Sequence, residues 1–233
     1  MKNSILFVGM FLWSVMTLAQ SDAKAIEILQ KNIEASGGKD KMMAIKSMTR
    51  TMEVNMPFGT AEAEAFYKNG KFYTKSSTQG NVVFEQKYDG NRAFVGGMQG
   101  NQVLDDEKAV KRIADQGKIF PMVDMETTTT LKYAGTDKVN GAECHKITTK
   151  SEDGNEGTMF FDAKSNMLVR MIQVGEFNGS KFESTIDFSD YKPIDNILFA
   201  HKMSMTNAQF SMEMKMKDIK LNPEIADKIF MIE

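Results

Sequence analysis

Histidine and cysteine, two residue types that often carry out chemistry, are few in this chain and do not form a catalytic pattern. The histidines are His145 and His201, and Cys144 is the only cysteine. Neither histidine has metal-site spacing, and the sequence contains no HExxH motif or paired cysteines, so we expect no metal and no cofactor. We interpret His201 as a hydrogen-bonded histidine of a sheet. Two alternatives are a polar group at the mouth of a ligand cavity and a hydrolase whose polar cleft surrounds His201.

Acidic residues form two groups whose spacing would suit acid–base catalysis. Asp187 and Asp190 lie near Asp195, and Glu62 and Glu64 share one face of a predicted strand. Such pairs could serve a glycosidase, but a solvated strand face explains them better. The sequence also lacks a GxSxG motif, a GxGxxG motif and a phosphate-binding P-loop. We therefore expect that the protein is not an enzyme.

The first residues have the composition of a secretory signal peptide. Lys2 precedes an apolar run from Ile5 to Leu18, and Ala19 stands before Gln20. A positive start, a short apolar run and a small residue at the cleavage point are typical of such signals, and the run is short for a membrane span. We expect residues 1–19 to be removed and residues 20–233 to form one periplasmic domain, with release outside the cell as an alternative.

Charge and cysteine content narrow the range of partners. The chain has 29 Lys and Arg residues and 31 Asp and Glu residues, so its net charge is −2. A weakly acidic surface of this kind does not attract nucleic acid or anionic membranes. We therefore predict no nucleic-acid partner, and we expect a monomer. A single cysteine gives an exported chain no internal disulfide, so a sizeable apolar core must hold the domain together. Cys144 is most simply a buried apolar residue of that core.

Two segments near the C-terminus alternate apolar and polar side chains with the period of a β-strand. Residues 199–205 and 210–217 each have one apolar face, and residues 206–209 between them favour a turn, so the pair predicts an antiparallel hairpin. Methionine dominates the apolar face, and methionine adapts to partners of variable shape. The apolar positions are Phe199, Met203, Met205, Phe210, Met212, Met214 and Met216.

The rest of the chain predicts helices at three places and strands elsewhere. Asp22 is positioned to cap a helix over residues 23–36, which Gly37 and Gly38 end, and a short helical turn follows over 39–45. Residues 105–116 predict a second helix, and an apolar stretch over 119–123 predicts an irregular segment or flap. Asn222 is expected to cap a last short helix. About eleven strands fill the remainder, one of them with Met52, Val54 and Met56 on one side, which predicts an α+β fold: a single antiparallel, strongly curved sheet, an incomplete β-barrel, covered by helices.

The order of these elements resembles the periplasmic lipoprotein-sorting proteins and their outer-membrane receptors, the LolA/LolB-like superfamily. The resemblance covers nearly all of the chain after the signal peptide. It differs from many relatives at Asn196 and Ala200, where Gly and Pro would stand, and in the lack of tryptophan after residue 13. Four segments carry the resemblance: Ala35-Ser36-Gly37-Gly38 running into residues 42–48, Tyr88 to Phe94, Met159 to Asp162 with Met167 to Arg170, and Phe188 to Tyr191 with Ile197 to Lys202.

The resemblance implies a barrel closed by helices, a cavity that holds acyl chains, and no enzymatic activity. We therefore expect a carrier or binder of lipid or lipoprotein acyl chains in an apolar, methionine-rich cavity, with an envelope membrane protein as a second partner. The alternative function is that of an envelope protein-interaction module without a small ligand. An exposed apolar patch would favour this alternative. The candidate lining is the seven apolar positions above with Met167 and Met171, and the candidate lid is Ile119, Phe120 and Met122.

Overall fold

The computed structural model describes residues 21–57, 59–98, 100–152, 154–177, 180–208 and 210–233, and it leaves the side chains of residues 176–181 undescribed. The expected signal peptide lies outside the described residues. Gln209, which belongs to the predicted turn over residues 206–209, also lies outside them.

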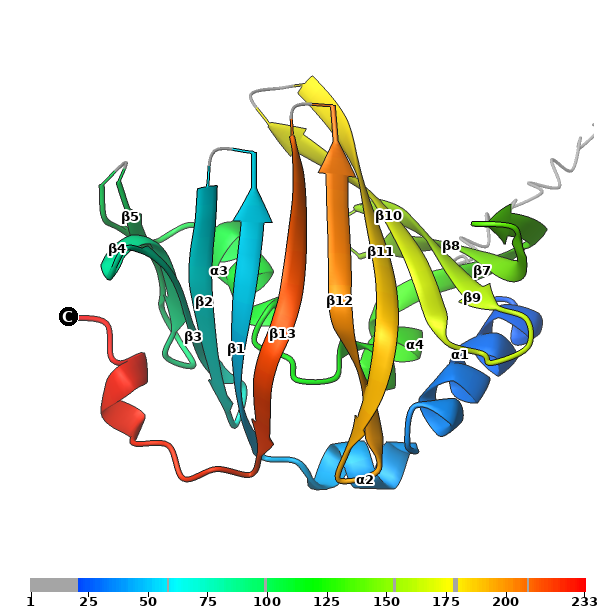
Figure 1. Cartoon of the computed structure of the whole chain (residues 1–233), viewed down its shortest axis with the longest axis horizontal. Helices are drawn as coiled ribbons and strands as arrows, with labels where there is room; N and C mark the ends of the chain where they lie inside the picture. Colours follow the sequence, from blue (N-terminus) through cyan, green and yellow to red (C-terminus); the bar gives the residue numbers. More distant parts are fainter. Residues whose placement is uncertain (1–20, 58, 99, 153, 178–179, 209) are drawn as a thin grey trace, which may run out of the picture.

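The described strands form one antiparallel sheet of 13 strands in the order β6-β5-β4-β3-β2-β1-β13-β12-β11-β10-β9-β8-β7 (Figure 1). The sheet bends around its covering helices without closing, which confirms the predicted incomplete barrel (Figure 1). The strands are β1 (Ser47–Met56), β2 (Gly59–Lys68), β3 (Lys71–Thr78), β4 (Asn81–Tyr88), β5 (Ala93–Gly97), β6 (Gln102–Leu104), β7 (Thr129–Val139), β8 (Ala142–Ser151), β9 (Glu156–Asp162), β10 (Leu168–Phe177), β11 (Ser180–Ile194), β12 (Ile197–Asn207) and β13 (Ser211–Leu221).

The predicted C-terminal hairpin is present and lies at the centre of the sheet. Met203 of β12 faces Met214 of β13, and Met214 in turn faces Val54 of β1. The first and last strands of the chain are therefore neighbours, and their apolar residues continue one another across the concave face. Alternation along each strand puts most of the charged residues of these strands on the opposite, convex face.

Helical segments cover the concave face. They are α1 (Ala23–Ala35), α2 (Lys39–Ala44), α3 (Glu107–Asp115), the 3₁₀ turn η1 (Pro121–Asp124) and α4 (Met125–Thr128). A last 3₁₀ turn, η2 (Asp227–Phe230), contacts β3 and belongs to the C-terminal segment. Helix α1 packs Ile28, Leu29 and Ile33 on a core that continues into β7–β10 and β12. Helix α3 packs Ile113 on a second core in β1, β2, β3, β5 and β13. The two helices thus cover different halves of the sheet, and the segment containing η1 lies between them (Figure 1).

The N-terminal segment docks on the edge strand β7. Asp22 occupies the N-cap position of α1, as predicted, but its carboxylate makes no capping hydrogen bond. The backbone N–H of Tyr133 donates to Asp22 Oδ2 at 3.0 Å, and Asp22 N–H donates to Leu131 O at 2.8 Å. Leu131 N–H donates to Ser21 Oγ at 3.0 Å. The Asp22 carboxylate therefore binds the edge of the sheet and does not cap the helix.

Glycine fixes the connection from α1 to α2. Gly37 has a φ of +132°, and a Cβ at this position would lie 2.7 Å from the carbonyl oxygen of Asn196. Only glycine allows the helix end to approach the β11–β12 turn this closely. The backbone N–H of Leu198 then donates to Ser36 O at 2.8 Å, which ties the helices to the lower end of the sheet.

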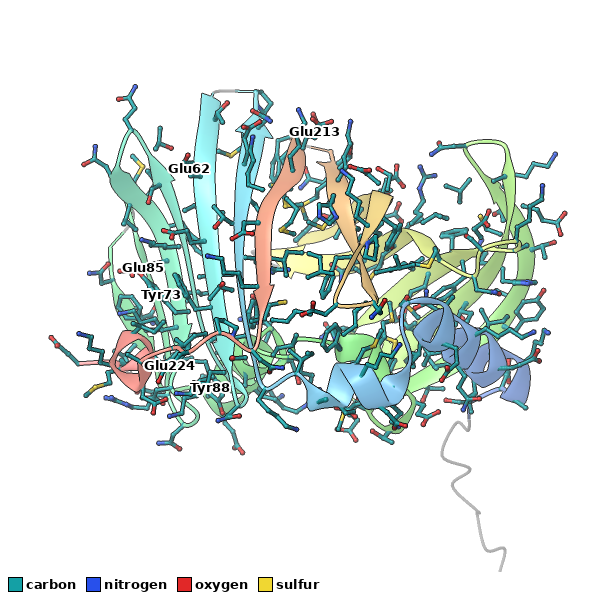
Figure 2. All side chains as sticks on the ribbon, turned by 60° about the horizontal axis from the view of Figure 1, so that its bottom comes forward. Glu62, Tyr73, Glu85, Tyr88, Glu213 and Glu224 are labelled. Carbon is teal, nitrogen blue, oxygen red and sulfur yellow. The ribbon has the colours of Figure 1, made fainter. Side chains whose placement is uncertain are left out.

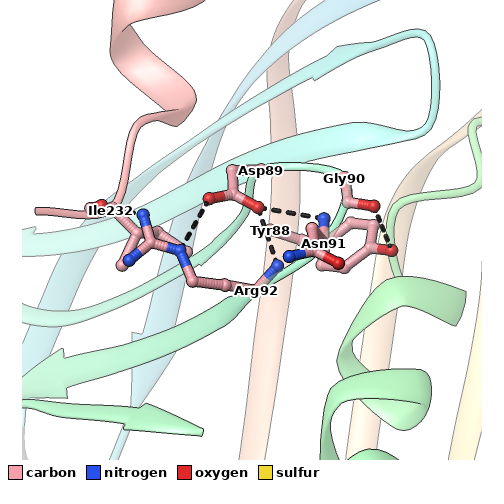
Figure 3. Close-up of polar contacts among 6 residues, drawn as sticks. All are labelled: Tyr88, Asp89, Gly90, Asn91, Arg92 and Ile232. Atoms are coloured by element: carbon pink, nitrogen blue, oxygen red, sulfur yellow. Dashed lines mark hydrogen bonds and ion pairs between the residues drawn. The ribbon is translucent and has the colours of Figure 1, made fainter. Parts of the chain in front are cut away.

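The C-terminal segment crosses the outside of the β2–β5 half of the sheet and meets the β4–β5 turn (Figures 1 and 3). In that turn, Asp89 Oδ1 accepts backbone hydrogen bonds from Asn91 at 2.9 Å and Arg92 at 2.7 Å. The Arg92 guanidinium contacts Asp89 Oδ2 at 3.3 Å and also donates to the carbonyl oxygen of Ile232 (Figure 3). The turn therefore anchors the end of the chain.

Charged residues of the central strands form ion pairs on the convex face. Glu213 bonds Lys202 at 2.6 Å, Lys217 bonds Glu53 at 2.6 Å, and Lys75 bonds Glu64 at 2.7 Å. Figure 2 shows Glu62 and Glu213 toward the rim of the sheet that is remote from α2. This arrangement supports the solvated-face interpretation of Glu62 and Glu64.

Two local details differ from what the sequence predicts. The short strand β6 is not predicted. Asn222 does not begin a helix. Its side chain instead accepts from Lys46 N–H at 2.8 Å, and the last helical turn starts only at Asp227. Both errors arise where short segments follow tertiary contacts in place of local propensity.

Candidate functional site

A cavity of about 210 Å³ lies between the concave face of the sheet and the covering helices. Its sheet side includes Phe199 and Met203 of β12 and Met216 of β13, and its helix side includes Ile33 of α1 and Met42 of α2. Most of the lining is apolar. The whole set is Asn32, Ile33, Ser36, Met42, Arg50, Ile119, Phe120, Pro121, Met122, Leu168, Phe188, Tyr191, Leu198, Phe199, Ala200, Met203 and Met216.

The segment from Ile119 to Met122 covers the cavity on the helix side. The Phe120 and Phe199 rings lie 5.9 Å apart, tilted by 42°, so an aromatic pair joins this segment to β12. Phe120 and Met122 pack on the core under α1, whereas Ile119 packs on the core under α3. The stretch predicted as an irregular segment or flap therefore bridges the two halves of the molecule over the cavity, and we call residues 119–122 the flap.

A group of methionines extends from the cavity toward the rim of the sheet that contains the β12–β13 turn, which is the upper rim in Figure 1. Met203, Met212, Met214 and Met216 pack around Met52 and its neighbours, and all four are partly exposed. Among the described residues, this group contains no helical residue. The cavity and the upper methionine face share Met203 and Met216, so the two apolar regions are continuous.

The structure divides the sequence-predicted lining residues into three sets. Phe199, Met203, Met216, Phe120 and Met122 line the cavity together. Others extend the same concave face without reaching the cavity: Met212 and Met214 lie in the upper group, Met205 is paired with Met212, and Met171 packs on the core under α1.

Met167 and Phe210 lie apart from the cavity lining. Met167 is buried near the end of α1, where Ser36 Oγ is 3.9 Å from its sulfur. Phe210 belongs to the β12–β13 turn, where its N–H donates to Asn207 Oδ1 at 3.0 Å.

Sequence reasoning missed two lining residues on β11. Phe188 and Tyr191 both line the cavity, although a strictly alternating strand would put them on opposite faces. Asp190 between them has a φ of +54°, a left-handed conformation that interrupts the alternation. Tyr191 Oη donates to Leu168 O at 2.6 Å, and burial raises the pKa of this hydroxyl above its ordinary value. Tyr191 is therefore a neutral, fixed part of the wall.

Arg50 is another missed residue, although its position gives a signal in the sequence. It lies in the alternating register of Met48, Met52 and Val54, where a charged side chain is unexpected. Among the described residues, Arg50 is the one charged side chain that lines the cavity. Its Nη2 donates to Tyr67 Oη at 2.6 Å, and its Cζ lies 5.2 Å from the centre of the Tyr67 ring.

Other hollows have different walls. A hollow of about 450 Å³ is lined mainly by threonine, lysine and glutamate side chains of β7–β11. A hollow of about 610 Å³ lies between Lys87, Phe94 and the last residues of the chain, on the outer side of the sheet. Neither offers the continuous apolar lining of the smaller cavity, which we therefore take as the candidate site.

The histidine, cysteine and aspartate residues first considered for chemistry make contacts that stabilise the fold. His201 Nδ1 lies 3.0 Å from the carbonyl oxygen of Phe199, so this nitrogen carries the proton of the hydrogen bond. Cys144 is fully buried beside Val139 and Phe160, and this burial raises the pKa of its thiol. Asp187 forms two bonds with Arg170, and Asp190 bonds Lys192 at 2.7 Å.

Within the described part of the chain, no three or more His, Cys, Asp or Glu side chains gather closely enough to hold a metal ion. None of the described helices is both long enough and apolar enough to cross a membrane.

The arrangement of sheet and helices is similar to that of several solved structures. An outer-membrane lipoprotein-sorting protein domain from Vibrio parahaemolyticus superimposes with a TM-score of 0.59 at 15% identity, covering 89% of this chain and 96% of the other. A LolA superfamily protein from Nitrosomonas europaea gives 0.59 at 12% identity, covering 89% and 97%. The chain has a LolA-like fold. A DUF1329 family protein from Desulfovibrio piger gives 0.60 at 10% identity, with coverages of 89% and 97%.

The LolA-like fold is evident from the structure and not from sequence matching. No family model matches the chain, and no curated protein matches its sequence. At 10–15% identity, fold is the only property that the likeness to these structures carries. What the cavity binds has to be argued from its own residues.

Proposed function

We propose that the protein is a non-enzymatic carrier or binder of lipid or lipoprotein acyl chains in the bacterial periplasm. The observation that carries the proposal is the apolar cavity under the flap, continuous with the methionines of the upper sheet face. A hydrocarbon chain gains about 0.8 kcal/mol for each buried CH₂, so even part of an acyl chain would bind measurably. Methionine side chains suit chains of different length and saturation because they adapt their shape.

The size of the cavity indicates that binding involves the flap. At about 210 Å³ it is smaller than the roughly 300–1,000 Å³ of common small-molecule sites, although an apolar cavity of about 150 Å³ already binds benzene. The closed form would therefore hold a segment of a chain. A longer chain would displace Phe120 or extend along Met203 and Met214 toward the rim.

Export to the periplasm remains a prediction from residues 1–19, and it fits this role. A carrier of acyl chains is needed where lipid-modified molecules must cross water between two membranes. An apolar site shielded from water by a flap would serve that transfer, and an envelope membrane protein would supply or receive the cargo.

The decisive experiment is native mass spectrometry of the mature protein purified from its own envelope fraction, followed by solvent extraction. A bound mass that extracts as lipid is the expected result. Uptake of a fluorescent fatty-acid analogue by the delipidated protein should then be competed by unlabelled fatty acid. A bare protein that also fails to take up the analogue would contradict the proposal.

The second candidate is an envelope protein-interaction module without a small ligand. The observation that favours it is the partial exposure of Met203, Met212, Met214 and Met216, a group that contains no helical residue among those described. It would become the better explanation if the native protein is bare and the analogue does not bind.

A further inference from the structure

We propose that Arg50 binds the carboxylate of a fatty acid or a similar single-chain amphiphile, whose hydrocarbon chain occupies the cavity and the methionine face above it. This inference rests on the proposed acyl-chain function and assigns the chemical class of the ligand. It starts from the place of Arg50 in the sheet. The guanidinium is charged at every physiological pH, yet β1 puts it on the apolar concave face with Met48 and Met52.

The hydrogen bonding of Arg50 is incomplete in a way that points to an anion. Nη2 donates to Tyr67 Oη at 2.6 Å, whereas Nε is buried and has no partner among the described residues. A buried donor on a charged group is costly when it lacks an acceptor. Nε and Nη2 form the edge of the guanidinium that binds the two oxygens of a carboxylate.

Arg170 shows how this same edge is filled elsewhere in the molecule. Its Nε lies 2.5 Å from Asp187 Oδ1 and its Nη2 lies 2.8 Å from Asp187 Oδ2. Asp187 stands directly opposite Arg170 on the neighbouring strand. The residues opposite Arg50 are Ala65 and Ile219, which carry no side-chain oxygen. Arg50 thus has the same edge as Arg170 without the internal carboxylate.

Arg50 lines the cavity, and its surroundings fix the guanidinium in position. Its direct neighbour on β2, Ala65, is small and buried. The Tyr67 ring lies under the guanidinium at 5.2 Å and is itself packed against Phe72. No acidic side chain lines the cavity among the described residues, so a bound carboxylate would meet no like charge.

Binding of dodecanoate and of 1-dodecanol tests this assignment, because the two share one chain and differ in charge. Isothermal titration calorimetry at pH 8 on the delipidated full-length mature protein should give at least tenfold tighter binding of dodecanoate, about 1.4 kcal/mol. The variant Arg50→Met should bind dodecanoate at least tenfold more weakly and dodecanol within twofold of the unmodified protein. Arg112→Met, which removes an exposed charge of α3, is the control and should behave as the unmodified protein does.

Each other outcome has a defined meaning. Equal binding of the two ligands by the unmodified protein would overturn the role of Arg50 and leave the acyl-chain function standing. Failure of both ligands to bind would overturn the proposed function itself. Displacement of dodecanoate by millimolar sodium acetate would show a site for small free anions and overturn the amphiphile assignment.

A second variant covers the case in which Arg50→Met does not fold. Arg50→Lys keeps the charge but loses the two-nitrogen edge, so it should keep only part of the preference for dodecanoate. Tyr67→Phe removes the hydroxyl that holds the guanidinium. If Arg50→Lys keeps the full preference for dodecanoate, and a folded Tyr67→Phe variant binds dodecanoate as tightly as the unmodified protein, Arg50 contributes only its charge. That result would contradict the two-nitrogen geometry.

Discussion

Met214 illustrates at the residue scale how one position links the fold to the proposed site. It faces Val54 on one neighbouring strand and Met203 on the other. Met214→Lys should lower the free energy of unfolding by about 1–3 kcal/mol, because it places a charge in an apolar layer. It should also weaken uptake of a fatty-acid analogue. Chemical denaturation and fluorescence titration measure the two effects.

Two controls frame that result. Met214→Leu keeps the apolar volume and should cost less than about 1.5 kcal/mol. Lys215→Met changes the next residue, which lies on the convex face and pairs with Glu213, and should leave uptake unchanged. An unaltered denaturation midpoint in Met214→Lys would mean that this side chain does not face the apolar layer.

Cys144 is expected to act only through packing. It is fully buried among Val139, Phe160 and their neighbours, and burial raises the pKa of its thiol, so the thiolate is scarce at neutral pH. Cys144→Ala should cost about 1 kcal/mol of stability and leave ligand uptake unchanged. Iodoacetamide should label the native protein very slowly. Rapid labelling, or loss of uptake without loss of stability, would instead indicate thiol chemistry.

At the scale of elements, the flap should control ligand exchange. Phe120 is half-buried and pairs with Phe199 across the cavity. Phe120→Ala should cost about 1–2 kcal/mol, less than the roughly 3–5 of a fully buried phenylalanine, and should speed release of a bound fatty-acid analogue. Stopped-flow displacement measures the rate. Phe94→Ala is the control because Phe94 lies near Lys87 on the other side of the sheet; equal release rates in the two variants would argue against a flap.

The Asp89 turn should give a pH dependence of stability. Burial alone would raise the pKa of Asp89, but hydrogen bonds from the Arg92 and Asn91 backbone and the Arg92 ion pair outweigh it and hold that pKa below its ordinary value of 3.8. A carboxyl whose folded pKa is lowered stabilises the fold above its unfolded pKa. That stabilisation disappears as the pH falls through the lower, folded value.

Asp89→Asn tests this linkage because asparagine keeps an oxygen for the two backbone donors and loses the charge. At pH 7 the variant should be less stable by about 0.2–1 kcal/mol, roughly 0.5–4 °C in melting temperature. Melting curves from pH 7 to pH 2 should show the difference shrinking toward zero at the acid end. A difference that stays constant over this range would contradict the ionic contribution of Asp89.

At the scale of the whole molecule, the periodic segments of the sequence predicted the sheet. Features that interrupt the periodicity were not predicted. Residues 199–205 and 210–217 alternate strictly, so their pairing and apolar face could be predicted. Tyr191 could not, because a left-handed residue at Asp190 interrupts the alternation. Arg50 could have been found as a charge in an apolar register. The division between lining and upper methionines depends on where the flap lies, which no periodicity encodes.

A sheet that stays open has two free margins, and this chain protects both. At one margin, β6 has only three residues. At the other, Ser21 and Asp22 occupy hydrogen-bonding groups of Leu131 and Tyr133 that would otherwise be available to another strand. The residues just after the expected cleavage point thus block this edge of the sheet from pairing with a strand of another molecule. Trimming the chain to begin after Asp22 should convert a dispersed protein into one that aggregates through β7.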